Sequence, residues 1–404
     1  MTEKNTLVYV LAGGSGTRLR PLTDPRAKPA VPFAGKYRIV DDVMSKLFYT
    51  DVSHIRVIPQ YEYRSLNNHI QDAWVPRASL KQSIRTLPPR QNAEGQGWYL
   101  GTADAINQNL KEIYEAAPDH VGVFAADHIS TLDVSEMITA HHSGKRDLTI
   151  AAEKRLVNEA DFEIQGKDKK LHYKYGIIEV DKNFKVMGFK EKPAPKDMPA
   201  SGKEVLVSMG NYIFETEPLT VALSKSYGND FGNHVLPGMK QAGARMYVYP
   251  FEGYWRDVGD LVSYYKTSLE LLLDEPPLDL IKLRRQNRAM LTLGTDYTPT
   301  RDSSSGKRSI ISEGCEFEEG VALDNSIISP AVKIGRGSII RNSIIFNGTI
   351  IGAGCVIQNT IVDKENKIPS GSQIGTNPVE DSRFTVVQYG NGNRLTVVPK
   401  DILK

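Results

Sequence analysis

A period of seventeen residues restricts the fold of this chain more than any other feature. Written in rows of seventeen, the segments DNSIIS at Asp324, RNSIIF at Arg341 and QNTIVD at Gln358 fall in one column. The same period aligns four further sets: Ile311, Ile328, Ile345 and Val362; Phe317, Ile334, Ile351 and Ile368; Leu323, Ile340, Ile357 and Ile374; Gly320, Gly337, Gly354 and Gly371. Large aliphatic residues recur about every six positions in each row, as in three short strands around a triangular coil. The pattern predicts a parallel β-helix, because an antiparallel sandwich would alternate with period two.

A β-helix offers a rigid, extended surface and few catalytic groups, so we expect a structural, regulatory or oligomerising domain here. Two segments before it are rich in turn formers or prolines, DEPPLDLIKLRR and TPTRDSSSGKRS. We therefore predict a first domain over residues 1–265, a linker over 266–307 and the β-helix over 308–404.

Length and charge limit the remaining function classes. A chain of 404 residues is long enough for two domains. Its 50 Lys and Arg residues nearly balance 48 Asp and Glu residues, which argues against a nucleic-acid binder that works through bulk phosphate attraction. Cys315 and Cys355 lie far apart in the sequence, and no apolar run approaches the roughly 20 residues that span a bilayer. We expect a cytoplasmic protein with neither nucleic acid nor membrane as partner.

The first half has the pattern of an α/β domain. Short apolar runs such as TLVYVLAGG, HIRVIPQY, HVGVFAAD and DLTIAAEK alternate with helical segments. TADAINQNLKEIYEAA has helical spacing, with Ile106, Leu110 and Ile113 on one face and Thr102 able to cap its start. Such alternation predicts a mainly parallel sheet, whose ligands bind at the carboxyl ends of the strands.

A glycine-rich turn follows the first of these strands. Gly13, Gly14 and Gly16 would let backbone N–H groups approach phosphate oxygens. The turn is not a dinucleotide fingerprint, because Leu19 stands where a third small residue belongs, and it is not a P-loop, which ends in Gly-Lys-Ser or Gly-Lys-Thr. Arginine follows the glycines at position 18, which points to polyphosphate chemistry. Taken without the rest of the chain, a solvated loop explains the turn as well.

Seven blocks of sequence resemble the sugar-1-phosphate nucleotidyltransferases, and within them the ADP-glucose pyrophosphorylases. They are LAGGSGTRLRPLT with KPAVPF, GWYLGTADA, AADHI, FKEKP, SMGNYIF, DFGNHVLP and YWRDVG, in the order of that family, and the resemblance runs from about Leu7 to the C-terminus. It implies a Rossmann-like α/β nucleotidyltransferase domain with a mostly parallel sheet, followed by a left-handed parallel β-helix.

The resemblance also implies a reaction, in which glucose 1-phosphate takes the adenylyl group of ATP to give ADP-glucose and pyrophosphate in bacterial glycogen synthesis. The second pKa of a phosphate monoester is about 6, so the attacking oxygen needs no general base at neutral pH. The remaining difficulty is to bring two polyanions together and to stabilise the leaving pyrophosphate, which calls for Mg²⁺ and positioned cations.

The resemblance implies roles for individual residues, according to their positions in the matching blocks. It implies catalytic roles for Arg18, Lys28, Asp127, Lys192 and Asp257, with Asp127 and Asp257 as the ligands of Mg²⁺. For the nucleotide it implies Leu11, Ala12, Gly13, Gly14, Gly16, Thr17, Gln60, Tyr99, Gly101 and Thr102, and for the sugar phosphate Gly176, Glu191, Lys192, Ser208 and Tyr212. The residue types alone also allow structural roles. An Asp at a strand end is often a turn or helix cap, and a Lys-Glu-Lys run is often an exposed strand end. Ser208 and Tyr212 could be core residues. We interpret Trp98 as packing and His128 as structural.

Three departures from the family pattern affect these expectations. Ala126 replaces a glycine beside Asp127, Asp42 replaces an apolar residue, and Pro25 replaces a lysine that binds phosphorylated activators in many bacterial relatives. Arg26 and Arg38 remain from that allosteric site, so we expect it to be altered or weakened. The family implies a homotetramer.

Two alternative functions share the fold. One is an enzyme that uses another nucleotide or sugar, such as UTP, dTTP or GTP. The other is a catalytically silent regulatory subunit, and the presence of all five charged catalytic residues argues against it.

Overall fold

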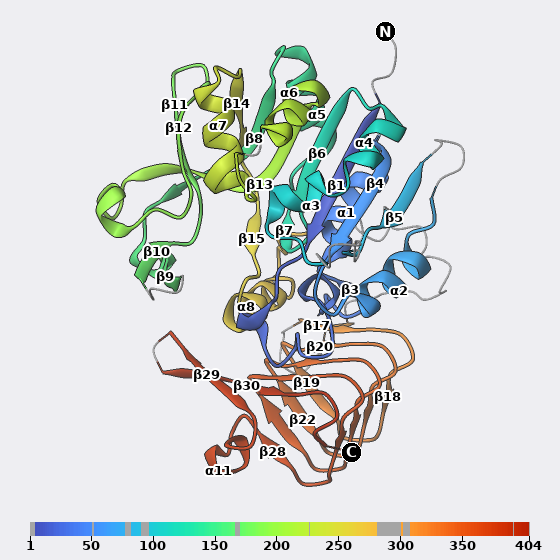
Figure 1. Ribbon diagram of the computed structural model, residues 1–404. Helices are drawn as coiled ribbons and strands as arrows, with labels where there is room; N and C mark the ends of the chain where they lie inside the picture. The colour runs from blue at the N-terminus through green and yellow to red at the C-terminus, as the bar shows by residue number, and fades with distance from the viewer. Residues whose placement is uncertain are drawn as a thin grey trace.

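The computed structural model describes residues 5–50, 52–76, 82–89, 97–165, 170–225, 227–280, 300–301, 308–390 and 392–403. Figure 1 shows an α/β body built from the N-terminal residues and a coil of short strands built from the C-terminal residues, with the termini at opposite ends of the molecule. Most of the predicted linker lies outside the described residues. Helix α8 (Leu261–Glu270) runs through the expected boundary at residue 265, and the two domain boundaries remain predictions.

A mixed sheet of nine strands forms the centre of the α/β body. Its main path has the order β12-β11-β13-β6-β1-β4-β5, and β8 pairs with both β13 and β14. The strands are β1 (Thr6–Ala12), β4 (Val52–Pro59), β5 (Ser83–Thr86), β6 (His120–Ala125), β8 (Leu148–Leu156), β11 (Ile177–Val180), β12 (Val186–Lys190), β13 (Glu204–Glu215) and β14 (Met246–Phe251). The predicted parallel arrangement is found from β6 through β1 and β4 to β5, whereas β13 runs antiparallel to β6, β8 and β11.

Helices cover both faces of this sheet because side chains along a strand point alternately to opposite sides. Val8 and Val10 of β1 belong to a core with α1, α2 and α5, while Leu7 and Tyr9 belong to a core with α3, α4, α6 and α7. These helices are α1 (Val40–Phe48), α2 (Tyr63–Ala73), α3 (Thr102–Asn107), α4 (Leu110–Ala116), α5 (Val134–Ser143), α6 (Thr216–Ser224) and α7 (Leu236–Gln241). The single-turn elements are η1 (Thr17–Leu19), η2 (Lys28–Ala30), η4 (Glu159–Asp161), η5 (Pro195–Asp197) and the π-helix η6 (Phe231–Val235).

The helix predicted from Thr102 is interrupted. Its sequence forms α3 and α4, separated at Gln108 and Asn109, with Ile106 and Ile113 buried on the expected face. The cap prediction is wrong: Gly101 occupies the N-cap position, and the Thr102 hydroxyl instead contacts residues 230 and 231 across the site described below.

Three two-stranded ribbons complete the body. They are β2 (Pro32–Phe33) with β3 (Tyr37–Arg38), β7 (His128–Ser130) with β15 (Trp255–Asp257), and β9 (Phe162–Gln165) with β10 (Lys170–Tyr173). None of the described helices combines the length and the apolar character that a membrane-crossing segment needs.

Three sheets of stacked parallel strands form the C-terminal coil, which confirms the predicted β-helix. The first contains β17 (Arg308–Ile311), β20 (Ile327–Ile328), β23 (Ile344–Ile345), β26 (Thr360–Val362) and β30 (Asn393–Val398), flanked by β16 (Thr300–Arg301) and β29 (Thr385–Tyr389). The second contains β18 (Glu316–Phe317), β21 (Lys333–Ile334), β24 (Ile350–Ile351) and β27 (Lys367–Ile368), and the third β19 (Ala322–Asp324), β22 (Ile339–Arg341), β25 (Val356–Gln358) and β28 (Gln373–Ile374). A short helix, α11 (Pro378–Asp381), follows the last coil.

The predicted columns are the ladders of this coil. Ile311 pairs with Ile328, Phe317 with Ile334 and Leu323 with Ile340, each one period apart, and the pairing continues along each column. The aligned glycines Gly320, Gly337, Gly354 and Gly371 all have φ between 66° and 77°, a conformation that glycine adopts without steric cost. Phe317, on the first coil, remains 39% exposed.

Candidate active site

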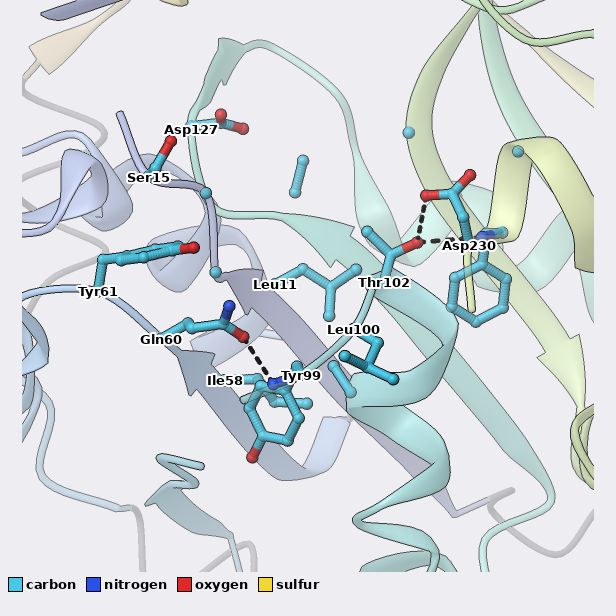
Figure 2. Close-up of a pocket in the computed structure, with 18 of the residues that line it drawn as sticks. Leu11, Ser15, Ile58, Gln60, Tyr61, Tyr99, Leu100, Thr102, Asp127 and Asp230 are labelled. Atoms are coloured by element: carbon cyan, nitrogen blue, oxygen red, sulfur yellow. Dashed lines mark hydrogen bonds between the residues drawn. The ribbon is translucent and has the colours of Figure 1, made fainter. Parts of the chain in front are cut away.

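A cavity of about 510 Å³ opens where the parallel strands β1, β4 and β6 end, the edge of the sheet at which the sequence predicts a ligand. Leu11, Ile58 and Ala125 are the residues of these three strands that reach it, and Figure 2 shows side chains from several segments around the same space. The lining contains ten of the predicted site residues: Leu11, Gly13, Gly14, Gln60, Tyr99, Gly101, Thr102, Asp127, Glu191 and Tyr212.

The glycine-rich turn forms one rim of the cavity. Gly13 and Gly14 line it, Gly14 is exposed, and there is open space around the position of a Cβ on Gly14. Gly16 has φ 64°, and its carbonyl accepts a hydrogen bond from Thr23 Oγ1 at 2.8 Å, which closes the turn. Ala12 ends β1 as a buried residue and Thr17 begins η1, so both lie beside the cavity without lining it.

Gln60 and Tyr99 form a second wall. The Gln60 side-chain oxygen accepts a hydrogen bond from the Tyr99 backbone N–H at 3.0 Å, and Figure 2 shows the amide nitrogen pointing away from Tyr99. The Tyr99 hydroxyl turns away from the cavity and donates to the Leu87 carbonyl at 3.1 Å. The fixed orientation of Gln60 leaves an N–H donor for a ligand.

Gly101 and Thr102 connect this wall to the far side of the cavity. A Cβ on Gly101 would lie 2.3 Å from the Asn229 carbonyl oxygen, so this close backbone approach requires glycine. Thr102 Oγ1 donates to Asp230 at 3.0 Å and accepts from the Phe231 N–H at 3.0 Å, as Figure 2 shows for Asp230. The two segments are thereby held together across the cavity.

Two acidic residues distant in the sequence meet at one lysine. Strand β15 pairs with β7 so that Asp257 lies opposite His128, the residue after Asp127. Lys28 Nζ lies 2.7 Å from Asp127 Oδ2 and 3.7 Å from Asp257 Oδ1. The sequence predicted these three residues as catalytic, and the fold brings their charged groups to a single point.

The charges at this point stabilise one another. Burial of Lys28 works against its positive charge, but the carboxylates of Asp127 and Asp257 outweigh this effect and raise its pKa above the ordinary value. Burial of Asp127 favours its neutral form, yet Lys28 and His128 hold the pKa of this carboxyl well below its usual range. At neutral pH the site therefore holds an ammonium ion between carboxylates.

The same arrangement matches the requirements of Mg²⁺. Carboxylate oxygens are the protein ligands that Mg²⁺ prefers, and it is usually held by one or two of them together with water and substrate phosphates. Asp127 and Asp257 both face the space beside Lys28, whose ammonium group shows that this space accepts a cation. We conclude that the donor set fits the metal.

Arg18 lies beside this group but is engaged elsewhere. Its guanidinium forms an ion pair with Glu163 of β9 and remains about half exposed. A Cβ on Gly259 would lie 3.2 Å both from Arg18 Nη2 and from Asp257 Oδ1, which places Arg18 next to the acidic pair. Glu163 carried no signal in the sequence, because no motif marks it and 145 residues separate it from Arg18.

Glu191 also lines the cavity, and its carboxylate lies close against two glycines. A Cβ on Gly176 would lie 2.7 Å, and one on Gly232 2.4 Å, from Glu191 Oε2, so both glycines make room for this carboxylate. Burial raises the pKa of Glu191, Lys192 opposes this shift and Asp230 adds to it. Lys192 has φ 43° and follows β12, and its carbonyl oxygen lies 2.8 Å from His172 Nδ1.

A bulge in β13 shapes the floor near Glu191. The pairing with β8 shifts between Ser208 and Tyr212, and Gly210 between them lines the cavity with φ 69°. Ser208 Oγ accepts from the Gly210 N–H at 3.3 Å and lies 3.5 Å from the Tyr212 hydroxyl. Tyr212 is nearly buried, and burial together with Glu191 raises its pKa, so its hydroxyl stays neutral.

Arg26 and Arg38, expected at an allosteric site, lie away from the cavity. Arg26 is buried and pairs with Asp363 of the β-helix, with Nη2 2.9 Å from Oδ1. Arg38 donates to the Ala30 carbonyl at 2.8 Å and to Ser65 Oγ at 3.0 Å, and it lines a smaller cavity of about 220 Å³ with Lys36, His69 and Lys364.

The sequence missed several residues of the cavity. Asp230, Gly232 and Tyr61 line it, and their blocks were noted without a role for these side chains. Trp98, interpreted as packing, is 56% exposed and stacks on Tyr61 with ring centroids 5.0 Å apart. Tyr61 directly follows Gln60 in the sequence and could have been noticed as a candidate. That Trp98 packs against Tyr61 follows only from the fold.

Two of the three departures, Ala126 and Asp42, have local explanations, and the position of His128 is explained by its packing. Ala126 is fully buried, and its N–H donates to the Leu11 carbonyl at 3.1 Å, so its methyl group is accommodated next to Asp127. Asp42 is buried in an ion pair with Lys46, and its Oδ2 accepts from the Ser130 N–H at 3.2 Å. His128 packs edge-on against Trp255, with ring centroids 5.4 Å apart.

Comparison with known proteins gives two family matches and a group of relatives. Residues 7–273 match the nucleotidyl transferase family, and residues 297–392 match the family described as GlmU-like, C-terminal hexapeptide, which agrees with the predicted left-handed coil. A glucose-1-phosphate adenylyltransferase of Anaeromyxobacter dehalogenans is 39% identical over 337 residues, which cover 76% of this chain and 78% of that protein. Another of the same name, from Trichlorobacter lovleyi, is 35% identical over 422 residues, which cover 98% of this chain and 97% of that protein.

Proposed function

The chain belongs to the nucleotidyl transferase family and, within it, to the glucose-1-phosphate adenylyltransferases, and from this we propose that it transfers the adenylyl group of ATP to glucose 1-phosphate. The products are ADP-glucose and pyrophosphate, as the first committed step of bacterial glycogen synthesis. The meeting of Lys28, Asp127 and Asp257 beside a cavity rimmed by a glycine-rich turn is the observation that carries this proposal.

In this function the protein positions two phosphate compounds and neutralises their charge. The glycine-rich turn and Arg18 hold the triphosphate of ATP, and the Gln60 amide donates to the base. Glu191 accepts hydrogen bonds from glucose hydroxyls, with Gly176, Ser208 and Tyr212 around the sugar, and Lys192 binds the phosphate of glucose 1-phosphate. An oxygen of that phosphate attacks the α-phosphorus and the bond to pyrophosphate breaks, so no protein group has to remove a proton.

Asp127 and Asp257 are the proposed ligands of Mg²⁺. When bound, the ion supplies neutralisation of phosphate charge in the transition state and orients the triphosphate. Lys28 is held by the same two carboxylates and provides a fixed positive charge at this place in the resting protein. Arg18 is exposed enough to leave Glu163 for a pyrophosphate group, to whose oxygens its guanidinium donates two N–H hydrogen bonds.

Pyrophosphate release tests this proposal. Purified protein with Mg²⁺ and glucose 1-phosphate is assayed with ATP, UTP, dTTP, GTP and CTP in separate reactions. We expect release with ATP and a loss of about a thousandfold or more in Asp127→Asn, because a misplaced metal removes several kcal/mol of transition-state stabilisation. Asp24→Asn is the matched control, since Asp24 forms an exposed pair with Arg20 away from the cavity and its loss should leave the rate unchanged.

The outcome also decides between the alternatives. Preference for another nucleotide would retain the reaction and contradict the assignment of the base. Failure with all five nucleotides would contradict the proposal and favour a silent regulatory subunit.

Regulation by phosphorylated metabolites is proposed to be weakened in this chain. Pro25 stands at the position of the activator-binding lysine, and Arg26 is engaged with Asp363 inside the protein. Arg38 and Lys364 remain on the wall of the smaller cavity, where burial together with Arg38 and Arg26 lowers the pKa of Lys364 to about 8. We expect little change in rate with fructose 1,6-bisphosphate, and strong activation would contradict this.

The proposal also includes the oligomeric state of the protein and its cellular compartment. We propose a homotetramer in the cytoplasm, in line with the family and with the use of ATP and glucose 1-phosphate, which are intracellular metabolites. Cys315 and Cys355 are both free thiols, as a reducing compartment allows. Light scattering should give four times the chain mass of 44.9 kDa, and a mass of one chain would contradict the tetramer.

A further inference from the structure

A cluster of three side chains outside the active site has the composition of a metal centre. Among the residues that the structure describes, His120, His141 and Glu215 bring one nitrogen or oxygen atom each within 4.8 Å of one another. His120 Nδ1 lies 3.5 Å and His141 Nε2 3.7 Å from the same carboxylate oxygen, Glu215 Oε1. Two imidazole nitrogens and one carboxylate oxygen are a common ligand set for zinc.

Rigid elements hold these three residues. His120 begins β6 and Glu215 ends β13, and the antiparallel register places them directly opposite each other. His141 lies in the last turn of α5, which packs on β8 and β13. The cluster is therefore built into the sheet and its covering helix, and its geometry does not depend on a loop.

A further contact orients His141 as a ligand. Its Nδ1 lies 2.9 Å from the hydroxyl oxygen of Thr149, a buried residue of β8. When Nδ1 carries the proton it donates to Thr149, and Nε2 then presents its lone pair toward Glu215. Metal-binding histidines usually have such a partner on the second ring nitrogen, which fixes the ring and its tautomer.

Burial and charge around the cluster favour a cation. Both histidines are fully buried, and their rings meet edge to face with centroids 4.9 Å apart, while the Glu215 side chain is 31% exposed and leaves a route from solvent. The nearby Arg245 is engaged by Asp147, with Nη2 2.6 Å from Oδ1, so its charge is already balanced.

We infer that His120, His141 and Glu215 form a structural site for one Zn²⁺ ion, with water as a fourth ligand. Tetrahedral bonds of about 2 Å to zinc require ligand atoms roughly 3.3 Å apart, so binding draws the three ligand atoms closer than the 4.8 Å within which they now lie. Strand β6 carries His120 at its start and Ala125, which lines the active-site cavity, at its end, so the two sites are separated by roughly 16 Å at 3.3 Å per residue. The ion links β6, α5 and β13 and takes no part in the reaction.

Metal binding to full-length protein tests the site, with Zn²⁺ and Co²⁺ as probes after dialysis against EDTA. All proteins carry Asp127→Asn, so that the active-site carboxylates do not bind the probe ion. We expect one Zn²⁺ per chain by calorimetry, visible Co²⁺ absorption typical of tetrahedral coordination, and a higher thermal midpoint with metal than without.

Matched variants separate zinc binding from a plain hydrogen-bonded cluster. Glu215→Gln keeps the shape of a partly exposed side chain and should weaken Zn²⁺ binding at least about tenfold, and Thr149→Val should weaken it about 10- to 100-fold through the ring of His141. Glu217→Gln is the control, because Glu217 is an exposed carboxylate two residues along the chain from Glu215, in the first turn of α6, and lies outside the cluster.

The control should bind Zn²⁺ as the parent does. No binding by the parent, or equal affinity in Glu215→Gln, would overturn the inference. Circular dichroism of each metal-free variant verifies that the fold is retained.

Discussion

The surroundings of two carboxylates at the candidate active site shift their pKa values in opposite directions: the pKa of Asp127 is lowered and that of Glu191 is raised. Both are partly buried, and partial burial favours the neutral acid. For Asp127 the adjacent Lys28 reverses this preference, whereas for Glu191 the neighbouring Lys192 does not outweigh burial and the charge of Asp230. Asp127 therefore stays ionised and suits a cation, while Glu191 is better prepared for hydrogen bonds with a neutral sugar.

The low pKa of Asp127 predicts a specific effect of pH on stability. An unfolded Asp titrates near 3.9, so the folded-state interaction contributes fully above that pH and is lost as the pH falls through the lower folded value. We expect Asp127→Asn to be less stable than wild type at pH 6, with the difference shrinking below about pH 4. Urea unfolding at a series of pH values measures it, and a constant difference would contradict the ion pair as its source.

Gly101 and Gly14 provide a matched pair of glycine substitutions. Gly101→Ala forces a methyl group against the Asn229 carbonyl and should cost about 1–3 kcal/mol of unfolding free energy. Gly14→Ala has open space and should leave stability within about 0.5 kcal/mol, although it alters the rim that the glycine-rich turn forms. Thermal unfolding compares the two, and equal midpoints would show that the contact at residue 101 is relieved by a backbone shift.

At the residue level, the sequence predicted which charged residues lie at the candidate site better than it predicted the ion pairs that they form. Asp127 ends a recognisable apolar strand, and the resemblance supplied Asp257 and Lys28. Nothing local predicts that Glu163 pairs with Arg18 or that Asp363 pairs with Arg26, because such pairings depend on how distant segments pack.

Asparagine residues explain one column of the seventeen-residue repeat. Asn325, Asn342 and Asn359 have φ between 45° and 48°, in the left-handed region that asparagine tolerates better than most residues. Their side chains form a ladder: Asn325 Nδ2 donates to Asn342 Oδ1 at 2.8 Å, and Asn342 Nδ2 donates to Asn359 Oδ1 at 3.2 Å. The repeat thus fixes both the corner of each coil and the contact between coils.

Substitution of the central asparagine separates these two contributions. Asn342→Gly keeps the backbone conformation and loses the ladder, which should cost about 1–2 kcal/mol for two hydrogen bonds. Asn342→Ala also places a methyl group in the left-handed region and should cost roughly 1 kcal/mol more. Urea unfolding of both variants measures the difference, and an alanine variant as stable as the glycine variant would contradict the role of the backbone.

Elements were predictable where the pattern is local and periodic. The β-helix ladders follow from the repeat because each strand pairs with the strand one period later. The interruption between α3 and α4 at Gln108 and Asn109 was not predictable from the apolar spacing, which continues through it. The antiparallel course of β13 was also missed, since strand direction depends on the connections and not on residue type.

The two halves of the molecule share one apolar core. Leu19, Tyr264 and Leu272 of the α/β body pack in the same cluster as Ile327 and Ile344 of the β-helix. The Tyr265 hydroxyl also donates to the Asn342 carbonyl at 2.6 Å. Figure 1 shows α8 lying between the central sheet and the coil, where these contacts form. We therefore expect the halves to unfold together, with the β-helix supporting the loop that carries Arg18 and Lys28.

The buried ion pair between Arg26 and Asp363 makes this coupling measurable. Arg26→Met leaves the Asp363 carboxylate buried without its cation and should cost about 3–5 kcal/mol of unfolding free energy. Arg26→Met with Asp363→Leu removes both charges and should recover part of that loss, because the penalty lies in the unpaired charge. Arg20→Met is the control, since Arg20 and Asp24 form an exposed pair that should contribute less than about 1 kcal/mol. If Arg26→Met and Arg20→Met are equally stable, the pair does not couple the halves, and their cohesion rests on the apolar core.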